Sequence, residues 1–165
     1  MKGLSRQNQQ KPIEIVQMVS FVVGDSDYAL DIMRIKEIIN PLQVTKVPKA
    51  PQFIEGVIEL RGAILPIVDL RKRFDLPASE PTRATKILIV GIDISGRKMI
   101  VGLVVDGVSE PIRVPREQVR PAPPLTQGAT PYFSGMVNYL GKILMVLDLD
   151  AILSSTEKIS LAGMA

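Results

Sequence analysis

Short apolar runs rich in Val and Ile recur along the chain, and Gly, Pro or Asp interrupts them every few residues. Runs of this length, bounded by turn-forming residues, are typical of β-strands. The pattern therefore predicts a mainly β protein. Ten strands are expected, at Ile15–Val23, Tyr28–Ile32, Val44–Val47, Gly56–Leu60, Ile64–Val68, Thr85–Asp93, Lys98–Val105, Ser109–Val114, Met136–Leu140 and Ile143–Leu147.

Turns and short helices account for most of the remaining positions. Gly24–Asp27 and Ser95–Gly96 have the composition of hairpin turns. Two short helices are predicted, at Met33–Ile39 and near Leu149–Leu153, and Asp148 is placed to cap the second.

An internal repeat relates two parts of the chain. Residues 51–70 align without a gap with residues 130–149, 79 positions further on. Each unit is interpreted as a strand, a glycine turn, a second strand and a capped helical turn. A weaker echo, which pairs Ile32–Glu37 with Val105–Glu110, carries little weight. Six positions of the main repeat are identical, namely Gly56/Gly135, Gly62/Gly141, Ile64/Ile143, Leu65/Leu144, Asp69/Asp148 and Leu70/Leu149.

Two halves of about five strands each favour closed sheets, because closure removes exposed edges. The predicted fold is two packed five-stranded β-barrels with short helices, sharing a continuous core or a tight groove. Residues 13–82 would form the first barrel and residues 83–155 the second, with the joint around Leu76–Thr85. A basic arm at residues 1–12 is predicted to be disordered, residues 121–124 form a stiff connector, and residues 156–165 form a tail.

The amino-acid composition limits the reactions and metal sites that the side chains can support. The chain has no His, Cys or Trp and 4% aromatic residues. Imidazole bases, thiolate nucleophiles and the common zinc, copper and haem ligand sets are thereby excluded, so neither a metal nor a cofactor is expected. The net charge of +3 is accounted for by Lys2, Arg6 and Lys11 in the arm, so the remainder is neutral. The apolar runs are far shorter than the ~20 residues that span a bilayer, so a cytoplasmic location is expected.

Three features could still suggest catalysis or nucleic-acid binding. The two glycines that precede Lys142 are six positions apart, whereas a phosphate-binding loop needs five and then Ser or Thr after the Lys. Asp69 and Asp148 could be catalytic carboxylates, but their equivalent places in the repeat favour helix capping. The cluster at residues 71–73 is either a solvated face or a nucleic-acid contact. A small basic barrel that binds nucleic acid is the alternative function, and a carboxylate hydrolase is a third.

Arg61 breaks the internal repeat. Its counterpart, Leu140, is apolar, so packing of this turn does not require a cation. Glu37, on the predicted helix, is a candidate partner for Arg61. Ile35 is either exposed apolar surface of the kind that docks a partner or part of the core.

Five motifs together resemble the bacterial chemotaxis adaptor family CheW, in the family's order and over about Val16–Leu153. The resemblance implies two five-stranded barrels and a non-enzymatic adaptor. It also implies the partners: the cytoplasmic tips of methyl-accepting chemoreceptors and the regulatory domain of the histidine kinase CheA, in arrays at the inner face of the membrane. The motifs are Tyr28-Ala-Leu-Asp-Ile, Ile35-Lys-Glu-Ile, Phe53-Ile-Glu-Gly-Val-Ile, Leu60-Arg-Gly-Ala-Ile-Leu-Pro-Ile-Val-Asp-Leu-Arg and Gly102-Leu-Val-Val-Asp-Gly-Val.

The resemblance also implies site residues. Val44 and Thr45 match a loop associated with kinase contact. Glu59, where Asn is usual, and Pro111, where an aliphatic residue is usual, depart from the family's pattern; these departures bear on partner choice and not on the fold. The positions that match those lining or supporting the receptor-binding groove between the barrels are Ile35, Glu37, Gly56, Arg61 and Gly102.

Overall fold

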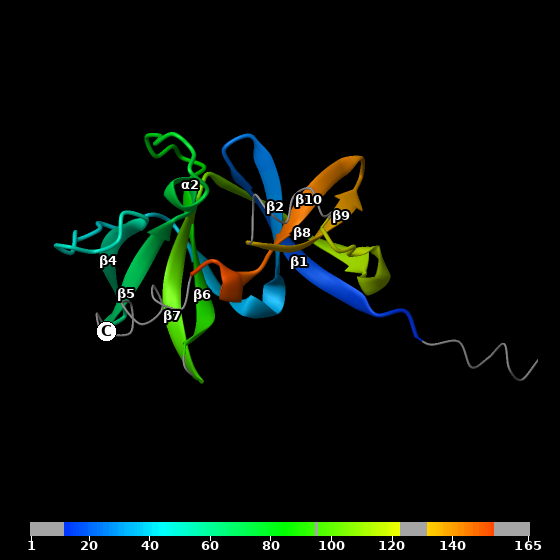
Figure 1. Ribbon diagram of the computed structural model, residues 1–165, viewed down its shortest axis with the longest axis horizontal. Coiled ribbons are helices and arrows are strands. Elements are labelled where there is room, and N and C mark those ends of the chain that lie inside the picture. Colours follow the sequence, from blue (N-terminus) through cyan, green and yellow to red (C-terminus); the bar gives the residue numbers. More distant parts are fainter. Residues whose placement is uncertain (1–11, 95, 123–131, 154–165) are drawn as a thin grey trace, which may run out of the picture.

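The computed structural model of the 165-residue chain describes residues 12–94, 96–122 and 132–153. Within these residues, ten strands form two five-stranded sheets that pack side by side (Figure 1). Nine of the ten predicted strands are confirmed. The predicted arm (except residue 12), the connector beyond residue 122 and the tail lie outside the described residues.

The first sheet has the strand order β8-β1-β2-β10-β9. Neighbouring strands run antiparallel, except that β2 and β10 are parallel. The strands are β1 (Ile15–Val23), β2 (Ser26–Asp31), β8 (Gly107–Pro115), β9 (Phe133–Tyr139) and β10 (Lys142–Leu147).

The second sheet has the order β3-β6-β7-β5-β4 and the same pairing scheme, with β5 and β7 parallel. Its strands are β3 (Ile35–Ile39), β4 (Ile54–Leu60), β5 (Ala63–Asp69), β6 (Lys86–Ile94) and β7 (Arg97–Val105).

Short helical turns connect the strands: η1 (Ile32–Arg34), α2 (Leu70–Arg73), η2 (Arg116–Gln118) and η3 (Leu149–Ala151). The capping prediction is confirmed at both repeat positions. The carboxylate of Asp69 accepts a hydrogen bond from the backbone N–H of Arg71, and that of Asp148 accepts one from Asp150. Each cap satisfies a donor that the first helical turn leaves unpaired.

The predicted helix Met33–Ile39 is wrong, because one 3-10 turn is followed by strand β3. The apolar residues at 32, 35, 38 and 39 have helical spacing, but pairing with β6 places Ile38 opposite Leu88 and Ile39 opposite Ile87. Isoleucine is β-branched and favours a strand once such a partner exists. The predicted strand Val44–Val47 is also wrong, and only an isolated bridge from Thr45 to Val57 forms there.

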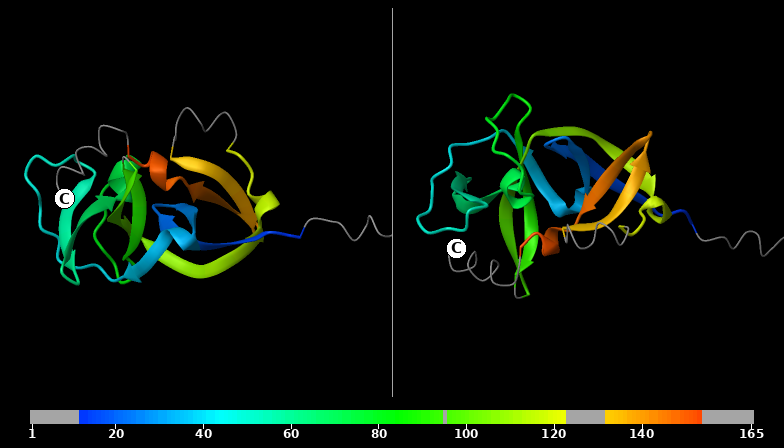
Figure 2. Two further views of the ribbon diagram at one scale, coloured as in Figure 1. Left: turned by 90° about the horizontal axis from the view of Figure 1, so that it is seen from below. Right: turned by 45° about the horizontal axis from the view of Figure 1, so that its top comes forward.

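The strands are shared between the sheets differently from the predicted division at residues 82 and 83. Each sheet combines a hairpin from one half of the chain with three strands from the other. Figure 2 shows β1 and β2, in blue, among the yellow and orange strands of the C-terminal half. After β2 and after β7 the chain crosses to the other sheet, through η1 before β3 and through a single residue before β8.

Closure into barrels is not confirmed, because in the described part of the chain no ladder joins β3 to β4 or β8 to β9. One bridge crosses each of these places, Thr45–Val57 in the second sheet and Arg120–Met136 in the first. We call the region between β3 and β4 the second-sheet seam. A Cβ atom on Gly56 would lie 2.1 Å from the carbonyl oxygen of Thr45, so glycine is needed for this close approach.

A continuous hydrophobic core joins the sheets. Phe21 and Tyr28 of the first sheet pack with Val90 and Leu103 of the second, and smaller clusters fill the opposite face of each sheet. The expectation of a shared core is therefore confirmed. No helix in the described part of the chain is long and apolar enough to cross a membrane.

Candidate functional site: an ion pair at the second-sheet seam

Arg61 lies in the tight turn between β4 and β5. Its φ angle is +49° and that of Gly62 is +83°, while Leu60 pairs with Ala63. Two successive residues with positive φ form the two-residue hairpin turn whose twist matches that of the strands. Leu140 and Gly141 form the equivalent turn in the first sheet, with φ angles of +52° and +84°. The two turns of the repeat therefore share a backbone conformation, whereas their first residue is Arg61 in one and Leu140 in the other.

The guanidinium of Arg61 binds Glu37 across the second-sheet seam. Nη1 donates to Oε2 and Nη2 donates to Oε1, each at 2.5 Å. Arg61 matches the two oxygens of the carboxylate with two parallel donors, which fixes its orientation. The prediction that these residues pair is confirmed. These hydrogen bonds lower the pKa of Glu37, and the positive charge of Arg61 acts in the same direction.

The pair is open to a partner. The side chain of Arg61 is 70% exposed and that of Glu37 is 28% exposed. A guanidinium has five N–H donors, so Arg61 keeps donors for a further acceptor while Glu37 holds it in place. This arrangement can recognise a polar or acidic group.

Three other predicted site residues meet at the second-sheet seam, further back along β4. The built Cβ position of Gly56 lies 2.1 Å from the oxygen of Thr45 and 2.8 Å from Cγ1 of Val44. Thr45 and Val57 exchange two backbone hydrogen bonds of 2.9 and 2.8 Å. Positions that the resemblance assigns separately to receptor and kinase are therefore adjacent on one sheet, a proximity that the sequence did not indicate.

The remaining two predicted residues face inward. Ile35 is half-buried and packs against the shared core. Gly102 is buried, and a Cβ there would lie 2.6 Å from Cδ1 of Ile67 and 2.8 Å from Cγ2 of Ile87. Gly102 supports the packing of the second sheet and makes no surface. The partner roles of the predicted site residues stay predictions.

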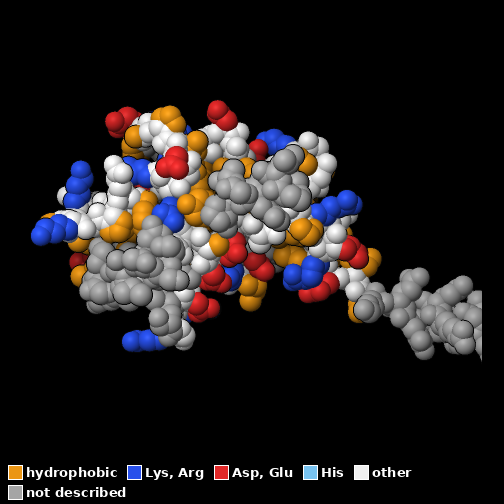
Figure 3. Space-filling view, in the orientation of Figure 1, with side chains coloured by type: hydrophobic (Ala, Val, Ile, Leu, Met, Phe, Trp, Pro, Cys, Tyr) orange, Lys and Arg blue, Asp and Glu red, His pale blue; other side chains and the backbone are white. Residues whose placement is uncertain are grey.

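The basic cluster at residues 71–73 is engaged within the protein. Arg71 forms an ion pair with Asp106 at 3.0 Å, and Lys72 forms one with Glu55. The guanidinium of Arg73 lies over the rings of Phe53 and Tyr132, at 4.5 and 5.1 Å from the centroids. Acidic and basic side chains are interspersed on the face in Figure 3. Neither this cluster nor this face therefore supports the nucleic-acid alternative, which needs a concentrated basic surface.

Several ion pairs between elements were not predicted from the sequence, and two of them lie where the chain crosses between the sheets. Arg34 pairs with Asp150, and Arg71 with Asp106, across 116 and 35 positions of sequence respectively. No local pattern connects residues so far apart. Within the described ranges, no group of three or more His, Cys, Asp or Glu side chains is placed to hold a metal ion.

Two packed β-sheets carry an exposed, oriented ion pair and a bridged loop, which are features that a protein-binding scaffold can use. Comparison with known proteins identifies the family to which this chain belongs. The family model of the CheW-like domain matches residues 17–157. The chain belongs to the CheW family, whose members are non-enzymatic adaptors of bacterial chemotaxis.

Individual relatives agree with this assignment. The chemotaxis protein CheW of Klebsiella aerogenes is 35% identical over 142 residues, which cover 86% of this chain and 83% of the relative. That of Rhizobium meliloti is 33% identical over 143 residues, covering 86% and 90%. The crystal structure of the scaffolding protein TtCheW from Thermoanaerobacter tengcongensis matches with a TM-score of 0.78 and 33% identity, covering 87% of this chain and 97% of that one.

Proposed function

We propose that this protein couples the cytoplasmic tips of chemoreceptors to the regulatory domain of the histidine kinase CheA, at the inner face of the membrane. Family membership supports the class of partner. The observation that carries the proposal on this chain is the Glu37–Arg61 pair, an exposed and oriented cation that the fold does not require, because Leu140 occupies the equivalent turn.

In this proposal Arg61 contacts the receptor. Glu37 holds the guanidinium in one orientation, and the remaining N–H donors bind a polar or acidic group on the receptor tip. A charge-assisted hydrogen bond of this kind contributes roughly 1.5 to 3 kcal/mol to binding. Glu37 is a positioning residue, because it acts through Arg61.

The kinase contact would use the loop at Val44 and Thr45. The Thr45–Val57 bridge holds this loop to β4, the strand that leads into the turn with Arg61. Two partners that bind side by side on one sheet are brought together at a high effective concentration. The protein would then raise kinase activity without turnover of its own.

Reconstitution tests the proposal. Kinase autophosphorylation is measured with the kinase alone, with receptor fragment, with this protein, and with all three together. We expect a large increase only in the complete mixture. Equal activity with and without this protein, in the presence of receptor fragment, would contradict the adaptor role.

A further inference from the structure

One outer strand of each sheet, β3 or β8, begins directly after the chain crosses from the other sheet. β3 enters the second sheet after η1, and β8 enters the first sheet after a single connecting residue. The residue immediately before each strand is charged: Arg34 before β3 and Asp106 before β8. The weak sequence echo between Ile32–Glu37 and Val105–Glu110 falls on these two crossings.

Arg34 connects the first crossing to both sheets. Its Nη2 donates to Oδ1 of Asp150 at 3.3 Å and to the backbone oxygen of Gly91 at 3.2 Å. Asp150 belongs to η3, which follows β10 of the first sheet, whereas Gly91 belongs to β6 of the second. One guanidinium therefore anchors the start of β3 from two sides.

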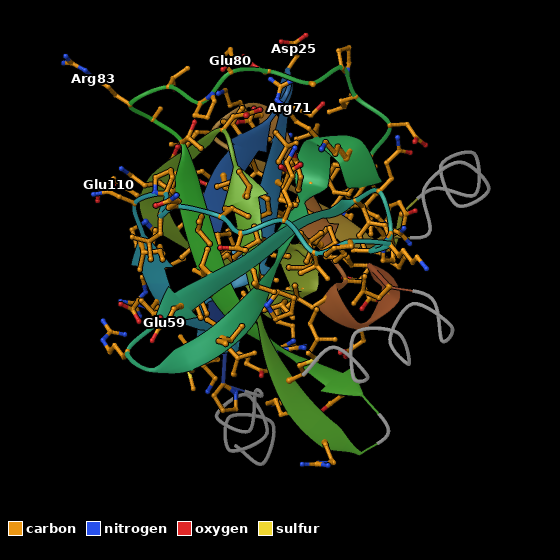
Figure 4. The ribbon with its side chains drawn as sticks, turned by 90° about the vertical axis from the view of Figure 1, so that its left-hand side faces the viewer. Asp25, Glu59, Arg71, Glu80, Arg83 and Glu110 are labelled. Atoms are coloured by element: carbon orange, nitrogen blue, oxygen red, sulfur yellow. The ribbon has the colours of Figure 1, made fainter. Side chains whose placement is uncertain are left out.

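Asp106 connects the second crossing to both sheets, and its charge is opposite to that of Arg34. It accepts a hydrogen bond from Nε of Arg71 at 3.0 Å and another from the backbone N–H of Gly24 at 2.7 Å. Arg71 belongs to α2, which follows β5 of the second sheet, and Gly24 to the β1–β2 turn of the first. Figure 4 shows Arg71 at the same end of the molecule as Asp25 of that turn.

The two ion pairs are equivalent in the internal repeat, with the charges exchanged. Arg71 and Asp150 are 79 positions apart, and the backbone N–H of each donates to its capping carboxylate, Asp69 at 2.9 Å or Asp148 at 3.1 Å. Both pairs are partly shielded from water, with side-chain exposures of 33% and 46% for Arg34 and Asp150, and of 21% and 28% for Arg71 and Asp106. Comparison of residue types alone does not reveal this equivalence, because both signs are reversed.

We propose that Arg34, held by Asp150, is a positioning residue for β3, and that Asp106, held by Arg71, positions β8. Among the described strands β3 forms a ladder with β6 alone, and a bulge between Ile35 and Glu37 interrupts that ladder. A strand with so few backbone bonds opens easily. The anchor at Arg34 keeps Glu37 where it can orient Arg61, and this consequence for binding rests on the proposed receptor contact.

Hydrogen exchange on the full chain separates this inference from the receptor contact. The variants are Arg34→Met, which keeps the aliphatic stem without the charge, and Asp150→Asn, a milder change of similar shape. Asp106→Asn is the matched control at the other crossing. Backbone amide exchange of β3 and β8 is measured for each variant together with its melting temperature and its affinity for a receptor hairpin fragment.

In Arg34→Met and Asp150→Asn we expect β3 amides to exchange about threefold to tenfold faster and β8 amides to be unchanged. Asp106→Asn should accelerate β8 alone. Receptor affinity should fall about threefold or more only in the first two variants. Unchanged β3 exchange in folded Asp150→Asn and Arg34→Met overturns the inference, as does equal acceleration of both strands in every variant. Faster β3 exchange with unchanged affinity overturns the consequence for binding. If the wild-type protein does not bind the hairpin, the proposed function fails, and exchange alone still decides the inference.

Discussion

Replacing Gly56 by alanine tests whether the close approach of Thr45 to β4 at the second-sheet seam stabilises the protein. A Cβ on this residue would lie 2.1 Å from the oxygen and 2.8 Å from the carbonyl carbon of Thr45. Both neighbours are backbone atoms, so no side-chain rotation relieves the overlap. The Thr45 segment must move away by about 1 Å or more to reach normal contact distance. Its two hydrogen bonds to Val57, at 2.9 and 2.8 Å, are then lost.

The size of the effect follows from these contacts. Two backbone hydrogen bonds contribute together about 1 to 3 kcal/mol to stability. The φ of Gly56 is +147°, which disfavours alanine further. A backbone conformation of this kind costs an L-residue about 1 kcal/mol or more. We therefore expect Gly56→Ala to lower the free energy of unfolding by about 2 to 4 kcal/mol, a fall in melting temperature of roughly 4 to 16 °C for a chain of this size.

Gly62→Ala is the matched control. Its φ is also positive, at +83°, but a Cβ there would meet no atom within 4 Å. It should cost only about 1 to 2 kcal/mol, from backbone strain. Urea denaturation of both variants gives the comparison, and kinase binding measured in parallel should weaken only in Gly56→Ala. If Gly56→Ala is no less stable than Gly62→Ala, the reasoning about the close approach to Thr45 is refuted.

Three further predictions concern Arg61, Asp69 and the residues before Ile13. Arg61→Ala should weaken binding of a receptor hairpin about tenfold, with little change in melting temperature because the side chain is 70% exposed; an equal loss in Arg113→Ala, an exposed arginine on β8, would show that only overall charge matters. Burial raises the pKa of Asp69 above its usual 3.8, and nearby Glu55 adds to this, so the native state binds more protons than the unfolded state in that range. The free energy of unfolding should therefore fall as pH rises from 3.8 through the raised pKa. Asp69→Asn should flatten this dependence in denaturation at several pH values, and an unchanged dependence in that variant would contradict the assignment. A chain that starts at Ile13, which is 69% exposed, should melt within a few degrees of the full chain, since surface changes seldom exceed about 0.5 kcal/mol; loss of cooperative melting would contradict this.

The sequence by itself determined the features that depend on a few neighbouring residues. Strand positions follow from short apolar runs between turn formers, and both aspartate caps follow from a carboxylate at the start of a helical turn. Arg61 was identified because the internal repeat supplies its own comparison at Leu140. The identity of the family was also present in the sequence, because its motifs occur in the right order over most of the chain.

Tertiary structure decided what depends on partners far along the chain. The segment after Arg34 has helical spacing, yet it becomes β3 because β6 offers an edge to pair with. The exchange of hairpins between the sheets leaves no local trace, since each half contains the same series of strands whichever sheet they enter. Gly102 matches a recognition motif, but only packing shows that Ile67 and Ile87 enclose it. Propensity and periodicity act over one turn or one strand, whereas pairing, burial and the ion pairs at the crossings arise only when distant segments meet.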